Sequence, residues 1–182
     1  VEPGGPLWGP AQRSIAASPT GDRIAFTRNE AGFGRLCVVD RATGQVTEIA
    51  RGVHGQLDWH GDRLVALRSG ARTPTEVVSY ATEGDPGAGW TRRCLMVGPA
   101  VGWEAVDLPE PALHVVATPD RLVPVRRYVA GQGRMIVHVH GGPTHQRPAE
   151  FLPRVALWCA RGVDVVVPHP PGSPRPGPAP PT

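Results

Sequence analysis

One short segment of the chain carries residue types that could do chemistry. His138 and His140 alternate along an apolar run, and Gly141, Gly142 and Pro143 follow directly. Glycines beyond the end of a strand let the backbone come close to a ligand, with its N–H groups free to point at that ligand. Preorganised N–H donors of this kind stabilise the oxyanion of a tetrahedral intermediate. A plain Gly-Gly turn between a strand and a helix would have the same local sequence, so both interpretations stay open at this point.

The chain lacks the sequence pattern of the catalytic serine that an oxyanion loop would serve. The chain has five serines, none of them within Gly-x-Ser-x-Gly: Ser14, Ser18, Ser69, Ser79 and Ser173. His138 and His140 could mimic a pair of metal ligands, but no third ligand stands at a suitable spacing. We therefore expect no triad residue, no metal ion and no cofactor in this chain. The other histidines considered should be ordinary loop or surface residues: His54, His60, His114 and His145.

A βαβ unit should position the glycine segment. Met135–Val139 is a nearly continuous apolar run, which predicts a strand in a sheet covered on both faces. The next apolar residues are spaced as on one face of a helix: Phe151, Leu152, Val155 and Trp158 or Cys159. Gly162 is a suitable helix end, and Val163–Val167 is the next apolar strand. Strand, loop, helix and strand imply a parallel pair, with the glycine segment beyond a carboxyl strand end, where ligands bind in open α/β sheets.

The first half of the chain predicts repeated β structure. The pattern Gly21-Asp22-Arg23-Ile24-Ala25 recurs as Gly61-Asp62-Arg63-Leu64-Val65, about 40 residues later, a spacing typical of four-stranded propeller blades. Strands are expected near 24–27, 36–40 and 45–49. An all-β sandwich would also give short strands and turns, but the repeat favours blades. Two blades do not close a propeller, so some apolar blade faces should stay exposed.

Composition and charge set the remaining limits. The apolar share is 40% and the net charge is +3, with Arg pairs such as Arg92-Arg93 and Arg126-Arg127 expected on a solvated surface. Neither a membrane span nor a nucleic-acid surface is expected from these features. The three cysteines are far apart and odd in number, which argues against a disulfide framework and against a zinc site. This pattern favours a reducing, cytoplasmic location.

The segment Ile136–Thr144 resembles the oxyanion loop of the prolyl oligopeptidase family of serine peptidases, near its acylaminoacyl-peptidase and dipeptidyl-peptidase-like members. The helix segment 151–155, the repeat at 61–65 and the linker Pro109-Glu110-Pro111 are also similar to that family, over about residues 18 to 168 in all. The family has a β-propeller followed by an α/β-hydrolase domain. His-Gly-Gly-Pro alone is shared with many esterases and lipases, but its position after blade-like repeats points to peptidases.

The resemblance implies a mechanism. A serine on a Gly-x-Ser-x-Gly elbow would attack the peptide carbonyl, activated by a histidine with aspartate support. By resemblance, all three triad residues lie beyond Thr182. Gly141 and Gly142 would help to stabilise the oxyanion, and His140 would shape the loop. In relatives with tyrosine at the His140 position the hydroxyl is a donor, so here the backbone N–H groups, Gly142 foremost, would have to serve.

The fold class expected is mixed, with a partial β-propeller followed by the first βαβ portion of an α/β-hydrolase domain. The propeller blades should occupy residues 1–106 and the hydrolase portion 107–167. Residues 168–182 include eight prolines and should form an extended, disordered tail. Its Pro, Gly, Ala and Arg mixture is also what a GC-rich gene yields out of frame, so we hypothesise a frameshift or truncation.

Three functions remain open from the sequence. The first is a fragment of a serine peptidase that hydrolyses small peptides in its full-length parent and is itself inactive. The second is a non-catalytic binding module of propeller type, and the third is an α/β-hydrolase esterase fragment. The expected partner is a peptide substrate in the parent protein, without nucleic acid or membrane.

Overall fold

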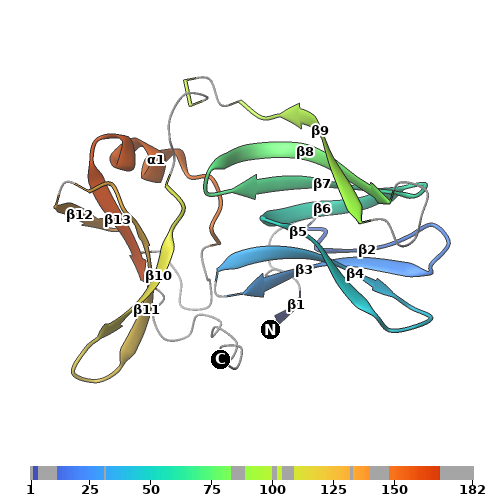
Figure 1. Cartoon of the computed structure of the whole chain (residues 1–182), viewed down its shortest axis with the longest axis horizontal. Helices are drawn as coiled ribbons and strands as arrows, with labels where there is room; N and C mark the ends of the chain where they lie inside the picture. Colours follow the sequence, from blue (N-terminus) through green and yellow to red (C-terminus); the bar gives the residue numbers. More distant parts are fainter. Residues whose placement is uncertain are drawn as a thin grey trace.

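The computed structural model contains three separate β-sheets (Figure 1). It describes residues 2–3, 12–30, 32–82, 89–99, 102–103, 109–131, 133–139 and 148–168. Sheet 1 contains β1 (Glu2–Pro3), β2 (Ile15–Ala17), β3 (Arg23–Glu30), β4 (Phe33–Asp40) and β5 (Val46–Arg51). Sheet 2 contains β6 (Val53–His60), β7 (Arg63–Gly70), β8 (Thr73–Thr82) and β9 (Trp90–Val97). Sheet 3 contains β10 (Ala112–Ala117), β11 (Leu122–Tyr128), β12 (Arg134–Val137) and β13 (Val163–Pro168), and the helix α1 (Pro153–Ala160) precedes β13.

Sheets 1 and 2 are antiparallel and repeat one another. Sheet 1 has the order β1-β3-β4-β5, with β2 also paired to β3, and sheet 2 has the order β6-β7-β8-β9. The strands β3 and β7 begin forty residues apart, at Arg23 and Arg63. Each is preceded by a turn glycine with positive φ, 72° at Gly21 and 59° at Gly61, a conformation that glycine adopts without steric cost. The sequence repeat is therefore a structural repeat, consistent with two propeller-like blades.

The two repeated sheets pack face to face. Strands that are equivalent in the repeat contribute opposite faces to this contact. On β3 the buried apolar residue is Ala25, whereas on β7 the buried apolar residues are Leu64 and Ala66, which are offset by one from the equivalent of Ala25. Successive side chains of a strand point to opposite faces, so sheet 1 uses one face of the repeat and sheet 2 the other. The shared core consists of Ala25, Leu36, Val38, Leu57, Trp59, Leu64, Ala66, Val78 and Tyr80. Each repeat therefore keeps a second face that its neighbour does not cover.

Sheet 3 contains the predicted βαβ unit. Its order is β10-β11-β13-β12, and β12 runs parallel to β13, with Ile136 opposite Val165. Between them, α1 begins with Pro153 in its first turn, where the missing N–H costs nothing. It ends before Gly162, which has φ of 72° and stops the helix. One face of α1 packs on the sheet, and the core there consists of Tyr128, Val155, Cys159, Val165 and Val167.

Two sequence expectations for sheet 3 need correction. The helix begins at Pro153, so Phe151 and Leu152 precede it. The strand β12 is not covered on both faces within the described residues: Met135 and Val137 are 54% and 58% exposed. The reason is that β12 lies at the edge of the sheet and α1 packs over β11 and β13. By contrast, β13 lies inside the sheet, is mostly buried as expected, and extends one residue further, to Pro168.

The three cysteines are free thiols, Cys37 and Cys159 buried and Cys94 exposed. Among the described residues, no helix is long and apolar enough to cross a membrane.

Candidate functional site at the turn from β12 to α1

The residues predicted to form the oxyanion loop, His140, Gly141 and Gly142, lie outside the described residues. The structure does describe the frame on either side of them. After β12 ends, the His138 backbone N–H donates to the Val166 carbonyl at 2.8 Å, so the chain still lies beside β13 there. Because β12 and β13 are parallel, the chain leaves the sheet at the carboxyl end, where open α/β sheets bind ligands. The oxyanion loop at His140, Gly141 and Gly142 itself stays a prediction.

The chain returns at residues 148–152, where hydrogen bonds attach it to both repeated sheets. The Ala149 N–H donates to the Gly32 carbonyl at 2.7 Å, in the turn between β3 and β4. The Phe151 N–H donates to Ser69 Oγ at 3.0 Å, at the end of β7. The Ser69 hydroxyl in turn donates to the Thr73 carbonyl at 3.3 Å. Two turns from different sheets therefore contact the three residues 149–151.

A buried arginine joins sheet 3 to the same turn of sheet 1. Arg126 on β11 is 1% exposed, and its Nη1 donates to the Gly32 carbonyl at 3.3 Å. Gly32 has φ of 87°, and a Cβ atom there would lie 3.0 Å from Arg126 Nη1, so this close approach requires glycine. The expectation that Arg126 is solvated is wrong, because β11 turns this side chain toward sheet 1. A buried charge without a partner would be very costly. The contact with the Gly32 carbonyl therefore helps to stabilise the junction, the region where sheet 3 meets sheets 1 and 2.

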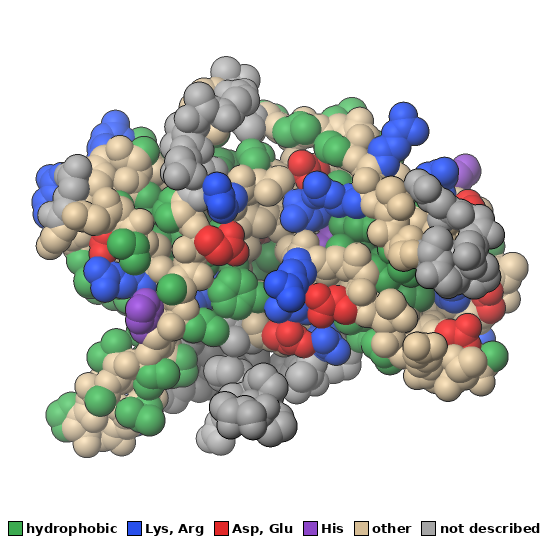
Figure 2. Space-filling model, viewed as in Figure 1, with side chains coloured by type: hydrophobic (Ala, Val, Ile, Leu, Met, Phe, Trp, Pro, Cys, Tyr) green, Lys and Arg blue, Asp and Glu red, His purple; other side chains and the backbone are tan. Residues whose placement is uncertain are grey.

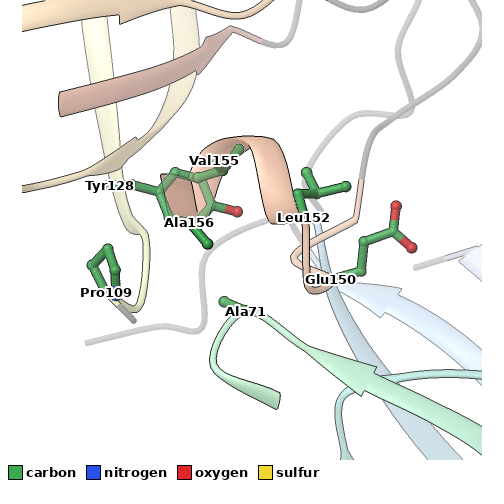
Figure 3. A pocket seen from close by; sticks show the side chains of 7 residues that line it. All are labelled: Ala71, Pro109, Tyr128, Glu150, Leu152, Val155 and Ala156. Carbon is green, nitrogen blue, oxygen red and sulfur yellow. The ribbon is translucent and has the colours of Figure 1, made fainter. Parts of the chain in front are cut away.

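The apolar side of the junction is closely packed. A cavity of only about 10 Å³ remains between sheets 2 and 3, which is room for about one water. Figure 3 shows Ala71, at the tip of the hairpin between β7 and β8, near the first turn of α1. Tyr128 of β11 and the helix residues Val155 and Ala156 line the same space. Burial raises the pKa of the Tyr128 hydroxyl, which therefore stays neutral.

A larger, charged cleft lies beside this contact. Its volume is about 370 Å³, and it lies between the turn ends of sheets 1 and 2 on one side and Glu110 and Ala149 on the other. Figure 2 shows basic and acidic side chains together across the middle of this face. Four arginines line the cleft: Arg35, Arg51, Arg68 and Arg72. Carboxylates neutralise at least two of them, since Arg35 pairs with Glu30 at 3.1 Å and Arg68 with Glu76 at 3.3 Å.

Asp164 fixes the turn that leads into β12. Its Oδ1 accepts the N–H groups of Ala130 at 2.7 Å and Gly131 at 3.1 Å, and its Oδ2 accepts Arg127 Nη2 at 2.6 Å. The backbone hydrogen bond from Ala130, followed by the Arg127 side chain, lowers the pKa of the carboxyl to about 2. This buried carboxylate acts structurally, because all its contacts hold β11 and its turn against β13.

His54 is the histidine that the sequence placed wrongly. It lies buried on β6, where Nδ1 is 2.9 Å from the Gly52 carbonyl and Nε2 is 2.7 Å from the Tyr80 hydroxyl. A carbonyl can only accept, so Nδ1 carries the hydrogen and Nε2 accepts from Tyr80. Burial lowers the pKa of His54 to about 4 and raises that of Tyr80 to about 12. His60 and His114 are exposed as expected, and His145 lies outside the described residues.

The described serines show no sign of a nucleophile. Ser18 Oγ donates to Asp22 Oδ1 at 2.6 Å within a turn, and Ser69 serves the junction. Ser173 lies outside the described residues. No group of three or more metal-ligating side chains occurs among the described residues.

The sequence did not indicate Gly32, Ser69 or Arg126 as junction residues. Their contacts join positions 82 and 94 residues apart. No periodicity or motif marks such pairs. The one available signal was that the turns of the repeated hairpins must share one end of their sheets.

Comparison with known proteins gives the class of protein with this arrangement. No family model matches the sequence, and no curated protein matches it. Solved structures do match. One is a puromycin hydrolase with 26% identity and a TM-score of 0.70, and the match covers 95% of this chain and 27% of the hydrolase chain. An acylaminoacyl peptidase of Pyrococcus horikoshii has 26% identity and a TM-score of 0.62 over 84% of this chain and 24% of its own. A puromycin-hydrolyzing peptidase of Mycobacterium tuberculosis, 22% identical with a TM-score of 0.74 over 95% of this chain and 28% of its own, shows the shared fold.

This chain thus has the fold of part of a peptidase. It spans about a quarter of the length of the peptidases that it matches. These neighbours support the resemblance to the prolyl oligopeptidase family.

Proposed function

We propose that this chain is part of a serine peptidase of the prolyl oligopeptidase family that hydrolyses peptide bonds of small peptides. Sheets 1 and 2 then belong to propeller blades in residues 1–106, and sheet 3 is the first portion of an α/β-hydrolase domain in 107–167. The match to puromycin hydrolase carries the proposal, because 95% coverage at 26% identity includes residues of all three sheets. The parallel pair of β12 and β13 with α1 between them supports the hydrolase portion.

The proposed chemistry of this part is oxyanion stabilisation. His140, Gly141 and Gly142 follow β12 directly in the chain, and the backbone N–H of Gly142 is the foremost candidate donor. When the serine of the remaining hydrolase attacks a peptide carbonyl, negative charge develops on the carbonyl oxygen. Preorganised N–H donors stabilise this charge, and losing one donor costs roughly 10²–10³ in kcat. The chain alone would bind no substrate productively, because in this proposal the triad and most of the substrate pocket belong to the rest of the peptidase.

The first experiment tests the chain alone. We expect the purified 182-residue chain to hydrolyse peptide and ester substrates no faster than background, since an oxyanion loop without a nucleophile and an oriented substrate has little to act on. Turnover that disappears when a fluorophosphonate labels a serine of this chain would contradict the proposal. A cooperative melt of a soluble, inactive chain would instead favour the binding module.

The second experiment supplies the missing part. A chimera in which residues 12–168 replace the matched segment of a puromycin hydrolase should hydrolyse aminoacyl or peptidyl anilides. In that chimera Gly142→Val should lower kcat by roughly 10²–10³, with a smaller change in KM, because the added bulk should displace the backbone N–H from the oxyanion, with the effect of losing one donor. Gly55→Val is the matched control, because a Cβ at Gly55 on β6 meets nothing within 4 Å. A folded chimera that reacts with fluorophosphonate but tolerates Gly142→Val would show that the loop is a plain turn.

A further inference from the structure

Equivalent positions in sheets 1 and 2 serve different purposes. Asn29 and Ser69 are each the seventh residue of their eight-residue strands, β3 and β7. Asn29 Oδ1 accepts the Gly32 N–H at 2.9 Å and so stabilises its own turn. Ser69 also contacts its own turn, through Thr73, but its oxygen in addition accepts the Phe151 N–H from the chain leading into α1. The hydrogen bond from Phe151 to Ser69 thus reaches the chain that leads into α1, whereas the one from Gly32 to Asn29 stays within a turn of sheet 1.

The geometry of the Ser69 hydroxyl suits a fixed contact. The side chain is 9% exposed, so water competes little for its oxygen. The hydroxyl has one hydrogen, which it donates to the Thr73 carbonyl at 3.3 Å, and this leaves a lone pair for Phe151 at 3.0 Å. Phe151 is held a second time through its ring, which lies edge-on to Trp103 with centroids 5.9 Å apart. The backbone at Phe151 is therefore fixed by groups on different elements.

This contact lies close in sequence to the proposed oxyanion loop. On one side of the predicted loop residues, the His138 N–H is bonded to the Val166 carbonyl, and on the other side the Ala149 N–H is bonded to the Gly32 carbonyl. Phe151 is two residues further on. An oxyanion donor acts only if it is in position before charge develops, so the groups that fix the ends of the loop influence its efficiency.

We propose that Ser69 is a positioning residue: through its hydrogen bond to Phe151 it holds the chain just before α1, on the C-terminal side of the predicted oxyanion residues His140, Gly141 and Gly142. Sheet 2 would thereby contribute to the reaction although it touches no reacting atom. This inference rests on the proposed function.

Hydrogen exchange on the full chain tests the contact itself. In Ser69→Ala the Phe151 amide should exchange about 5- to 10-fold faster, the effect of losing one hydrogen bond of ordinary net strength. Ser69→Thr keeps the hydroxyl and should restore the protection. Ser79→Ala is the matched control, because Ser79 is also buried in sheet 2 but lies on β8 and pairs with Val65 and Arg93. Equal exchange at Phe151 in wild type and Ser69→Ala overturns the proposal.

Kinetics of the chimera test the positioning role. Ser69→Ala should lower kcat about tenfold with KM within about twofold, because a displaced donor weakens transition-state binding more than substrate binding. Ser69→Thr should recover kcat, and Ser79→Ala should leave it unchanged. Unaltered kcat in Ser69→Ala overturns the proposal, and so does a loss that Ser79→Ala shares. Faster exchange at Phe151 in a chimera that reacts with no fluorophosphonate would instead count against the proposed function, so the two failures are distinguishable.

Discussion

The paired sheets 1 and 2 differ from sheet 3 in how their apolar residues are used. The pair encloses a core of nine buried residues drawn from both sheets, with Trp59 also donating from Nε1 to the Ala16 carbonyl at 3.1 Å. Sheet 3 has a core of five residues under α1. Every residue of β10 is exposed, and so are Met135 and Val137 of β12. Sheet 2 also has an exposed apolar edge on β9, at Leu95, Met96 and Val97, so the two regions differ mainly in the size of their cores.

The difference shows that a repeated sheet and a sheet covered by a helix bury their apolar side chains in different ways. Two copies of a repeat can cover one face of each other, because equivalent strands present opposite faces. Sheet 3 is mixed, with one parallel pair of the kind that is usually covered on both faces, and among the described elements α1 covers one face of β11 and β13. Sheet 3 depends on its junction with the pair for further support, through Arg126, Gly32 and Ser69. Four predictions test this contrast.

The largest effect is expected in the shared core. Leu64 on β7 is fully buried, so Leu64→Ala should lower the free energy of unfolding by about 3 kcal/mol through lost burial and a residual cavity. Leu113 on β10 is 48% exposed, and Leu113→Ala should change it by less than about 0.5 kcal/mol. Urea unfolding followed by tryptophan fluorescence measures both. Similar losses for the two variants would mean that sheet 3 is as well covered as the pair.

The next effect concerns the junction. Gly32→Ala should destabilise the chain by about 2 kcal/mol, because alanine is strained at φ of 87° and its Cβ would press on the Arg126 guanidinium. Gly44→Ala is the matched control, with a similar φ of 70° but nothing within 4 Å of a Cβ. It should cost only the backbone strain, about 1 kcal/mol. Equal losses in thermal unfolding would show that the Gly32–Arg126 contact adds nothing.

Acid should weaken the pair before it weakens sheet 3. Burial lowers the pKa of folded His54 from 6.5 to about 4, so the unfolded chain binds more protons between these values. Unfolding is then favoured as the pH falls through this window, by about 1.4 kcal/mol per pH unit. The pKa of Asp164 in sheet 3 is lowered from 3.8 to about 2, so its contribution is lost only as the pH falls below about 4.

Urea unfolding at several pH values measures this dependence. His54→Gln should flatten the slope between pH 6.5 and 4, whereas His60→Gln, at an exposed site, should not. Arg68 and Arg92 are the charged groups that act on His54, and both disfavour its protonation. A slope that persists in His54→Gln would assign the acid sensitivity to another group.

The smallest effect on stability is expected at the edge of sheet 3. Met135→Lys and Val137→Lys place a charge where the side chains are already more than half exposed, so the free energy of unfolding should change by less than about 0.5 kcal/mol. Self-association should decrease, because charges on an exposed apolar edge oppose strand pairing between copies. Light scattering at increasing protein concentration measures this. A large loss of stability would show that β12 is covered in solution.

Local patterns predicted several of the elements, for identifiable reasons. The turn glycines Gly21 and Gly61 and the strands that follow them could be predicted because turn chemistry and alternation act over a few residues. The βαβ order of sheet 3 followed from two apolar runs and a helical spacing between them. The helix start was missed by two residues because Phe151 and Leu152 share the apolar spacing but precede Pro153. The candidate loop at His140, Gly141 and Gly142 is a prediction from motif and position, since those residues lie outside the described part.

By itself, the sequence determined the repeat, several of the strands and the turn that ends α1, because each depends on neighbours along the chain. Only the tertiary structure decided which side chains meet across the sheets. His54 looked like a surface residue and Arg126 like half of a solvated pair, yet packing buries both. The same packing brings Ser69 to Phe151 and Arg126 to Gly32, across 82 and 94 residues. Such contacts depend on how complete sheets dock, and no local propensity of either partner specifies that docking.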